Sequence, residues 1–213
     1  MISIRVVASG SSGNFCIVGG NTAIDMGVPY KMFEPYKDEV KLVLLTHIHS
    51  DHFKASTIRR IAYEKPLIKF ACGAFLAPAL MDCGVRKDRI QILRPGMVYD
   101  FGICKVIPFE LQHDVPNYGY KVHFDGGKVI YATDTRSMSG VVAKDYDWYL
   151  VEANYDDDEI WERMDAKAEV GVYAYERRVI LNHLSKQKCD EWLERNMGPE
   201  SQYIYMHRHG GMQ

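Results

Sequence analysis

The segment "LLTHIHSDHF" (residues 44–53) places three histidines and an aspartate within six consecutive positions, directly after an apolar run of strand length. The chain has 8 histidines and 28 acidic residues among 213, so the spacing H-x-H-x-[DE]-H arises by chance in about one such chain in a thousand. The polar residues of an ordinary surface loop therefore explain it poorly. Such a loop at a strand end can direct His47 and His49 to one ion, and Asp51 and His52 to a neighbouring one. The sequence predicts a metal site here.

The composition is that of an ordinary globular protein, with 47% hydrophobic and 25% charged residues, and the length fits one domain over residues 1–213. A net charge of −2 gives no global basic field, although bound cations can still attract nucleic acid. No apolar run approaches the roughly 18 residues of a membrane span, and the amino end lacks a signal-peptide pattern. The five cysteines form no C-x-x-C pair, which favours reduced, buried thiols. We therefore expect a cytoplasmic protein with no membrane contact.

Strand-like runs alternate with helical segments along the chain. The runs "ISIRVVA", "KLVLL", "KVIPFEL" and "WYLVEAN" are rich in β-branched and apolar residues, as expected of strands. Helical spacing appears over residues 55–66, and Ser185 is placed to cap a helix that ends near Arg195. We expect a single α/β domain with sheets sandwiched between helices.

The motif "THIHSDH" after a buried strand resembles the first signature of the metallo-β-lactamase superfamily, T-H-x-H-x-D-H. Four further segments resemble other motifs of this family and occur in the family's order: "AIDMG", "ELQHDVPNYGY", "VIYATDT" and "LNHLS". Each lies at the end of an apolar run, so together they are more specific than any one of them alone. The resemblance implies the fold of the family, a four-layer αββα sandwich in the α/β class.

The resemblance also implies two divalent cations, Zn²⁺ or Mn²⁺, held by side chains of these motifs. Carried onto this sequence, the ligands of the first ion are His47, His49 and His113, those of the second are Asp51, His52 and His183, the bridging carboxylate is Asp134, and the hydrogen-bonding partner beneath the site is Asp25.

A site of this kind favours hydrolysis. Two divalent cations, two aspartates and a shared hydroxide leave a net charge of about +1, which attracts an anionic substrate. The cations lower the pKa of bound water toward ~7, so the bridging hydroxide is the expected nucleophile and Asp51 and Asp134 take part in catalysis. Considered alone, Asp134 in "TDT" is also consistent with an ordinary turn acid, and His183 with a neighbour of a helix cap.

Two more segments, "VASGSSGNFCIV" and "LVEANYDDDEI", resemble the WalJ/YycJ-type subgroup, which is associated with DNA exonuclease activity. This resemblance implies a nuclease or phosphodiesterase, 5′-3′ exonuclease-like, with DNA favoured over RNA. Ser11, Ser12 and Asn14 in the turn "SGSSGN" would then contact a substrate phosphate; the alternative is a plain Gly/Ser connection between strands. Phe53-Lys54 after the first motif, in place of Gly-Gly, argues against the glyoxalase-like branch.

The segment "YMHRHGGMQ" adds two histidines after the last expected strand. His207 or His209 can act as general acid toward the leaving oxygen, because an imidazole pKa near ~6.5 suits proton transfer; a basic tail is the alternative. Tyr118 is either strand packing or, since it follows His113 closely, part of the cleft wall. Two rival functions remain: a thioester or lactone hydrolase (glyoxalase II-like) on the same fold, and a non-catalytic metal-binding module. The complete ligand set argues against the module.

Overall fold

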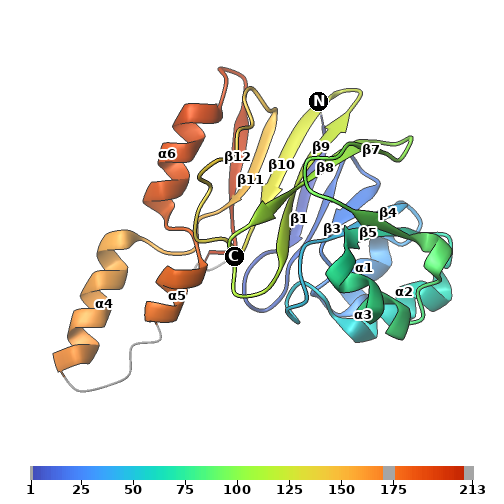
Figure 1. Ribbon diagram of the computed structural model, residues 1–213, viewed down its shortest axis with the longest axis horizontal. Coiled ribbons are helices and arrows are strands. Elements are labelled where there is room, and N and C mark those ends of the chain that lie inside the picture. The colour runs from blue at the N-terminus through green and yellow to red at the C-terminus, as the bar shows by residue number, and fades with distance from the viewer. Residues whose placement is uncertain (1, 170–175, 209–213) are drawn as a thin grey trace.

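Two six-stranded sheets lie face to face in the computed structural model, which describes residues 2–169 and 176–208 (Figure 1). The first sheet has the order β1 (Ile4–Ala8), β2 (Phe15–Val18), β3 (Thr22–Ile24), β4 (Leu42–Leu45), β5 (Lys69–Gly73) and β6 (Ile90–Leu93). The second has the order β12 (Gln202–Met206), β11 (Trp148–Glu152), β10 (Gly127–Ala132), β9 (Asn117–Phe124), β8 (Lys105–Leu111) and β7 (Tyr99–Asp100).

Helices cover the outer face of each sheet, which confirms the four-layer αββα sandwich that the sequence predicts (Figure 1). On the side of the first sheet lie α1 (Tyr30–Phe33), α2 (Ala55–Glu64) and α3 (Ala77–Asp82). On the side of the second lie α4 (Asp157–Glu169), α5 (Glu176–Asn182) and α6 (Lys186–Asn196). Short 3₁₀ turns occupy η1 (Glu34–Tyr36), η2 (Ala74–Leu76) and η3 (Lys87–Arg89).

The continuous apolar run of β4 follows from its position between two layers. Val43 and Leu45 pack in the cluster that faces the helices, whereas Leu42 and Leu44 pack in the cluster between the two sheets. Successive side chains of a strand point to opposite faces, so a strand covered on both sides is apolar at every position. All four residues are at most 1% exposed.

The second sheet is covered in the same way. Tyr149 of β11 packs with Trp192 of α6 in the outer cluster, while the next residue, Leu150, faces the first sheet. Helix α6 begins as the sequence predicts, because the side chain of Ser185 accepts a hydrogen bond from the backbone N–H of Lys188 at 3.4 Å.

Strand direction brings the functional loops together. Strands β3 to β6 run parallel to one another, and so do β10 to β12. Residues that follow parallel strands emerge at the same edge of a sheet. The loops after β3, β4, β8, β10 and β12 therefore meet at one end of the sandwich, and the polar motifs of the sequence lie in these loops.

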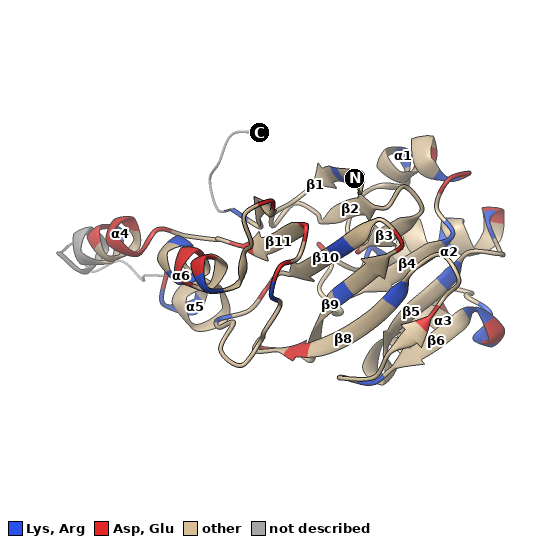
Figure 2. Ribbon diagram, turned by 90° about the horizontal axis from the view of Figure 1, so that it is seen from above, with Lys and Arg blue, Asp and Glu red and all other residues tan. Residues whose placement is uncertain are grey.

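Acidic residues gather on α4 (Figure 2). Asp157, Asp158 and Glu159 occupy its first turn, where the positive end of the helix dipole favours negative charge. Asp156 Oδ1 also accepts a hydrogen bond from the backbone N–H of Asp158 at 3.1 Å. The acidic run therefore stabilises the start of a helix.

The five cysteines are buried and unpaired, as the sequence predicts. Burial raises the pKa of the Cys72 and Cys189 thiols to about 12, so both stay protonated at neutral pH and neither acts as a nucleophile. Within residues 2–169 and 176–208, no helix combines the length and the apolar character needed to cross a bilayer.

Candidate metal centre

Three imidazole nitrogens meet at the end of the sandwich, from two loops far apart in the sequence. His47 and His49 follow β4, and His113 follows β8. His47 Nε2 lies 3.2 Å from His49 Nδ1, and His113 Nε2 lies 3.3 Å from the same atom. Nitrogens that share one tetrahedral zinc ion, each at ~2.0–2.1 Å from it, lie about 3.3–3.4 Å apart. The spacing of the three nitrogens therefore fits one cation.

The opposite nitrogens of two of these rings contact oxygen atoms. His113 Nδ1 lies 3.3 Å from the carbonyl oxygen of Asn182, and His47 Nδ1 lies 3.0 Å from Thr46 Oγ1. An oxygen partner on the far side of a ligand imidazole fixes its tautomer and its orientation. The rings are thus held with Nε2 turned toward the cluster.

A second cluster beside the first combines carboxylates with imidazole. His52 is fully buried, and its Nε2 lies 2.7 Å from Asp134 Oδ2 and 3.5 Å from Asp51 Oδ2. Asp134 follows β10 and is 3% exposed. The ligand atoms of His47, His52 and Asp134 all lie within 4.8 Å of one another. Asp134 therefore stands between the two clusters.

His207 lies in this second cluster. Its Nε2 is 3.4 Å from Asp51 Oδ2, and the residue is 5% exposed. The backbone N–H of His207 donates to Ser9 Oγ at 2.7 Å, and Asn154 Nδ2 donates to its carbonyl oxygen at 2.8 Å. A residue held in this way is no part of a loose basic tail. His209, the other histidine considered as an acid, lies outside the described residues.

The ligand atom of His183 lies within 4.8 Å of those of Asp134, Glu152 and His207, at the edge of the second cluster. His183 Nδ1 lies 2.7 Å from Glu152 Oε1 and 3.5 Å from Asp134 Oδ1. The family resemblance implies His183 as a ligand of the second cation. In the structure its closest partner is Glu152, and the imidazole beside Asp51 is that of His207.

Glu152 is a site residue that lies outside the five sequence motifs. It ends β11 and is fully buried. Its Oε2 accepts hydrogen bonds from the backbone N–H groups of Thr135 at 2.8 Å and Leu184 at 3.3 Å, which leaves Oε1 directed at His183. The signal was present in "WYLVEAN": an acidic residue at the end of an apolar run, the same arrangement that marks Asp134 in "VIYATDT".

Asp25 lies behind the second cluster, fully buried. Its Oδ2 contacts His52 Nδ1 at 2.6 Å and accepts a hydrogen bond from the Tyr131 hydroxyl at 3.2 Å. Its Oδ1 accepts hydrogen bonds from the backbone N–H and the hydroxyl of Thr46 at 2.9 and 2.8 Å. One carboxylate thus orients His52 and the start of the histidine loop together.

The turn "SGSSGN" places its three candidate substrate contacts differently. Ser11 is exposed and lines the cleft above the two clusters; Ser12 is exposed in the same turn. Asn14 is fully buried, and its Nδ2 lies 2.8 Å from His52 Nε2 and 3.2 Å from the carbonyl oxygen of Asp51. Asn14 therefore holds the histidine loop from behind.

The buried carboxylates favour positive charge on the neighbouring imidazoles. Burial opposes a charge on His52, but Asp134 and the other nearby carboxylates outweigh it and raise the pKa of His52 well above the ordinary value. Burial opposes the charged form of His207 too, yet Asp134 and Asp51 raise its pKa to about 10. By contrast, burial lowers the pKa of His47 well below its usual range. The negative charges of Asp51 and Asp134 must therefore be balanced by positive charge, either from protons on the neighbouring imidazoles or from metal ions.

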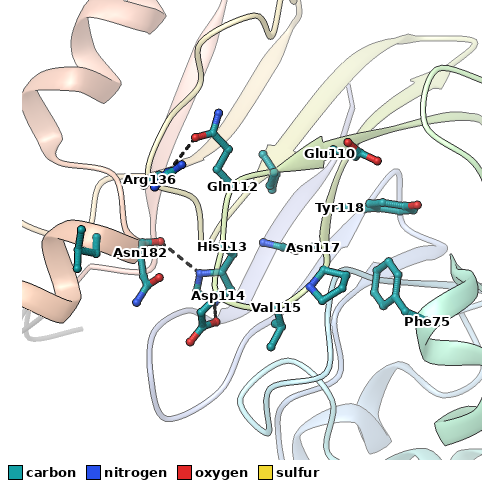
Figure 3. A pocket seen from close by; sticks show the side chains of 13 residues that line it. Phe75, Glu110, Gln112, His113, Asp114, Val115, Asn117, Tyr118, Arg136 and Asn182 are labelled. Carbon is teal, nitrogen blue, oxygen red and sulfur yellow. Dashed lines mark hydrogen bonds and ion pairs between the residues drawn. The ribbon is translucent and has the colours of Figure 1, made fainter.

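Two adjoining cavities open at this end of the molecule. The smaller, of about 220 Å³, is lined by residues of both clusters together with Ser11, Arg178 and His183. The larger, of about 590 Å³, shares His113, Asp114 and Asn182 with it and extends away from the clusters (Figure 3).

The donor set suits divalent cations. Imidazole nitrogens and carboxylate oxygens converge within a few ångströms, and this mixture of ligands suits zinc and manganese alike. The nitrogens of His47, His52 and His113 that face away from the clusters contact oxygen atoms. Such contacts orient the imidazole ligands of a metal ion. The residues present therefore fit the cations that the family resemblance implies.

A family model described as "Beta-lactamase superfamily domain" matches residues 21–184, most of the chain. The chain belongs to the metallo-β-lactamase superfamily. Within this superfamily protein the matched region contains the histidine loop, His113, Asp134, Glu152 and His183, and His207 follows it.

Two curated relatives of this metallo-β-lactamase superfamily protein carry nuclease names. Exodeoxyribonuclease YycJ of Bacillus anthracis is 29% identical over 73% of this chain, and the match spans 64% of that protein. Exodeoxyribonuclease WalJ of Streptococcus pneumoniae is 26% identical over 94% of this chain and 79% of that protein. The chain thus spans less than two thirds of the length of the first relative.

Solved structures show the same superfamily fold. The metallo-β-lactamase fold protein YhfI from Bacillus subtilis superposes with a TM-score of 0.75 at 14% identity, covering 99% of this chain and 88% of that one. The short form of human tRNase Z superposes with a TM-score of 0.67 at 16% identity, covering 98% and 92%. These similarities establish the fold.

Proposed function

We propose that this protein is a phosphodiesterase that uses two divalent cations and acts on nucleic acid, with DNA favoured over RNA. The observation that carries the proposal is the meeting of two ligand clusters at Asp134, beneath an open cleft. Membership of the superfamily and the names of the relatives indicate a hydrolase. The exodeoxyribonuclease names of two relatives favour a DNA substrate.

In this proposal the second cation has a different imidazole ligand from the one that the sequence predicts. His207 Nε2 lies 3.4 Å from Asp51 Oδ2, and its ligand atom groups with those of Asp51 and His52. The proposed sets are therefore His47, His49 and His113 for the first cation and Asp51, His52 and His207 for the second. Asp134, whose ligand atom groups with those of His47 and His52, would be the carboxylate that the two sets share. When bound, the cations supply positive charge to a phosphate and lower the pKa of water, so that it attacks at neutral pH.

His183 is then the proposed proton donor. Glu152 contacts Nδ1 of the ring, so Nε2 on the opposite edge is the nitrogen presented to the cleft that His183 lines. A proton on Nε2 can pass to the leaving oxygen as the phosphodiester bond breaks. The buried carboxylate of Glu152 fixes the tautomer and stabilises the charged ring, as the aspartate of a catalytic triad does.

The mouth of the cleft offers groups for the phosphate oxygens. The Arg178 side chain is 73% exposed, lines the cleft, and pairs with Asp114 at 3.3 Å. An arginine with exposed donors can add a bidentate contact to a phosphate. Ser11, on the cleft wall, is the proposed hydroxyl contact from the glycine- and serine-rich turn.

A comparison of substrates on metal-analysed protein tests the proposed function. We expect bound divalent cations, turnover of a chromogenic phosphodiester and of 5′-phosphorylated single-stranded DNA, slower turnover of the matching RNA, and no turnover of a glutathione thioester. Loss of phosphodiester activity in His47→Ala would tie the activity to this centre. Thioester turnover in the absence of phosphodiester turnover would overturn the proposal.

A further inference from the structure

The larger cavity has an unusual combination of walls for a space that adjoins a metal centre. Its volume is about 590 Å³, within the range of small-molecule sites. His113, proposed as a ligand of the first cation, lies between its two ends (Figure 3). One end carries Arg136 and Asn182, and the other carries the aromatic side chains Phe75 and Tyr118.

The aromatic end is fixed in place by contacts on both sides. The rings of Phe75 and Tyr118 pack edge to face, with centroids 5.1 Å apart and planes at 83°. Phe75 comes from η2 beside the first sheet, and Tyr118 comes from β9 of the second. The backbone N–H of Tyr118 also donates to the carbonyl oxygen of Thr46 at 3.2 Å. The aromatic wall is therefore tied to the residue that precedes the metal-binding histidine His47.

The two ends differ in charge. Arg136 is exposed, and its Nε donates to Gln112 Oε1 at 2.9 Å, so two residues that line the cavity are joined at this end (Figure 3). At the other end Glu110 is the cross-strand partner of Tyr118, so both side chains stand on the same face of the sheet. A ligand that suits this cavity carries a negative group at the Arg136 end and a planar ring with hydrogen-bond donors at the Tyr118 end.

A nucleotide unit has this distribution of groups. Its phosphate is anionic, its base stacks on aromatic side chains, and the exocyclic amino group of adenine, cytosine or guanine can donate to a carboxylate such as that of Glu110. We propose that the cavity is a nucleoside subsite. In this subsite a base next to the cleaved phosphodiester turns out of the base stack of the strand and contacts Phe75 and Tyr118. This inference rests on the proposed function and names the substrate class of the same site: single-stranded or frayed DNA ends.

If the base stacks on the ring, removing either one should lower kcat/KM by the same factor. Removing both should lower it no further. Two 5′-phosphorylated single-stranded oligonucleotides are compared, one with all its bases and one with an abasic tetrahydrofuran unit next to the cleaved bond. We expect the wild-type protein to lose roughly 10-fold in kcat/KM on the abasic strand. Tyr118→Ala should lose about as much on the normal strand and little more on the abasic one. Tyr118→Phe, which keeps the ring, should behave as the wild type does.

Three controls separate stacking from other causes. Phe75→Leu keeps the apolar volume but removes the ring, so it should resemble Tyr118→Ala. Tyr63→Ala removes a ring that is 87% exposed on α2 and should change neither substrate. A 2-aminopurine base beside the cleaved bond should lose fluorescence on binding to the wild-type protein and keep it with Tyr118→Ala.

The outcomes distinguish this subsite from the proposed function. Equal rates of the wild-type protein on normal and abasic strands would remove the subsite and leave the phosphodiesterase proposal intact. Equal losses of Tyr118→Ala on both strands would show a structural effect and also overturn the subsite. Absence of turnover of any phosphodiester by metal-loaded wild-type protein would remove the function, and the subsite with it.

Discussion

The carboxylate of Glu152 and the imidazole of His183 meet at 2.7 Å, Oε1 to Nδ1, from a strand end and from the segment between two helices. Glu152 ends a central strand and is fully buried, whereas His183 follows α5 and lines the cleft. A buried acid behind an imidazole that faces a cleft is the arrangement that orients a proton donor.

The first prediction concerns proton transfer by His183. His183→Gln should lower kcat for DNA by roughly 10²–10⁴-fold, because the leaving alkoxide then lacks a proton donor. The same variant should cleave a 4-nitrophenyl phosphodiester at nearly the normal rate, since nitrophenolate leaves without protonation. Steady-state kinetics on both substrates measures the difference. Equal losses on the two substrates would show that His183 has another role.

A second prediction concerns Glu152, which we expect to act through His183. Glu152→Gln keeps the shape of the side chain but removes the charge that stabilises the imidazolium, so kcat for DNA should fall roughly 10–100-fold. The alkaline limb of the pH profile should move to lower pH. The proton donor must be protonated, and without the Glu152 carboxylate that raises the pKa of His183, burial lowers this pKa. An unchanged pH profile would contradict the positioning role.

The third prediction separates the two histidines by metal content. His207→Ala should lose one of the two bound cations, because its Nε2 lies beside Asp51 at 3.4 Å. His183→Ala should keep both cations. Elemental analysis after gel filtration gives the stoichiometry of each variant. If His183→Ala loses a cation and His207→Ala does not, His183 is the ligand of the second cation, as the sequence resemblance implies, and His207 is not.

A fourth prediction tests the residue that joins the two clusters. Asp134→Ala should abolish phosphodiester turnover, since the carboxylate of Asp134 lies close to one proposed ligand of each cation, His47 and His52. The far-ultraviolet circular dichroism spectrum should remain that of the wild-type protein. Measurable turnover by this variant would show that the two clusters act independently.

The fifth prediction concerns a glycine that the centre requires for steric reasons. A Cβ added at Gly27 would lie 1.7 Å from the carbonyl oxygen of Asp51, so Gly27→Ala should displace the histidine loop and cost about 3 kcal/mol of unfolding free energy. Gly126→Ala is the matched control, because a Cβ there meets no heavy atom within 4 Å. It should change the stability by less than about 0.5 kcal/mol. Urea denaturation compares the two, and equal midpoints would rule out the clash.

The sequence by itself determined the local chemistry of this protein. The spacing in "THIHSDH" brings four donors into one loop, and contiguous residues after a strand stay close in any fold that forms the strand. The apolar runs also determined the layers, since a strand such as Leu42–Leu45 that is apolar at every position is stable only with cover on both faces.

Tertiary structure alone decided which distant side chains join the loop. Strands β11 and β12 pair with Glu152 opposite Met206, and this register places His207 beside the acidic centre. Asp25, Asp134 and His207 also have positive φ angles of 60°, 56° and 52°, a backbone conformation that non-glycine residues adopt at a cost and that surrounding contacts must maintain. Pairing register and backbone strain depend on contacts between residues far apart in the chain. The spacing of residues within a motif therefore cannot predict either of them.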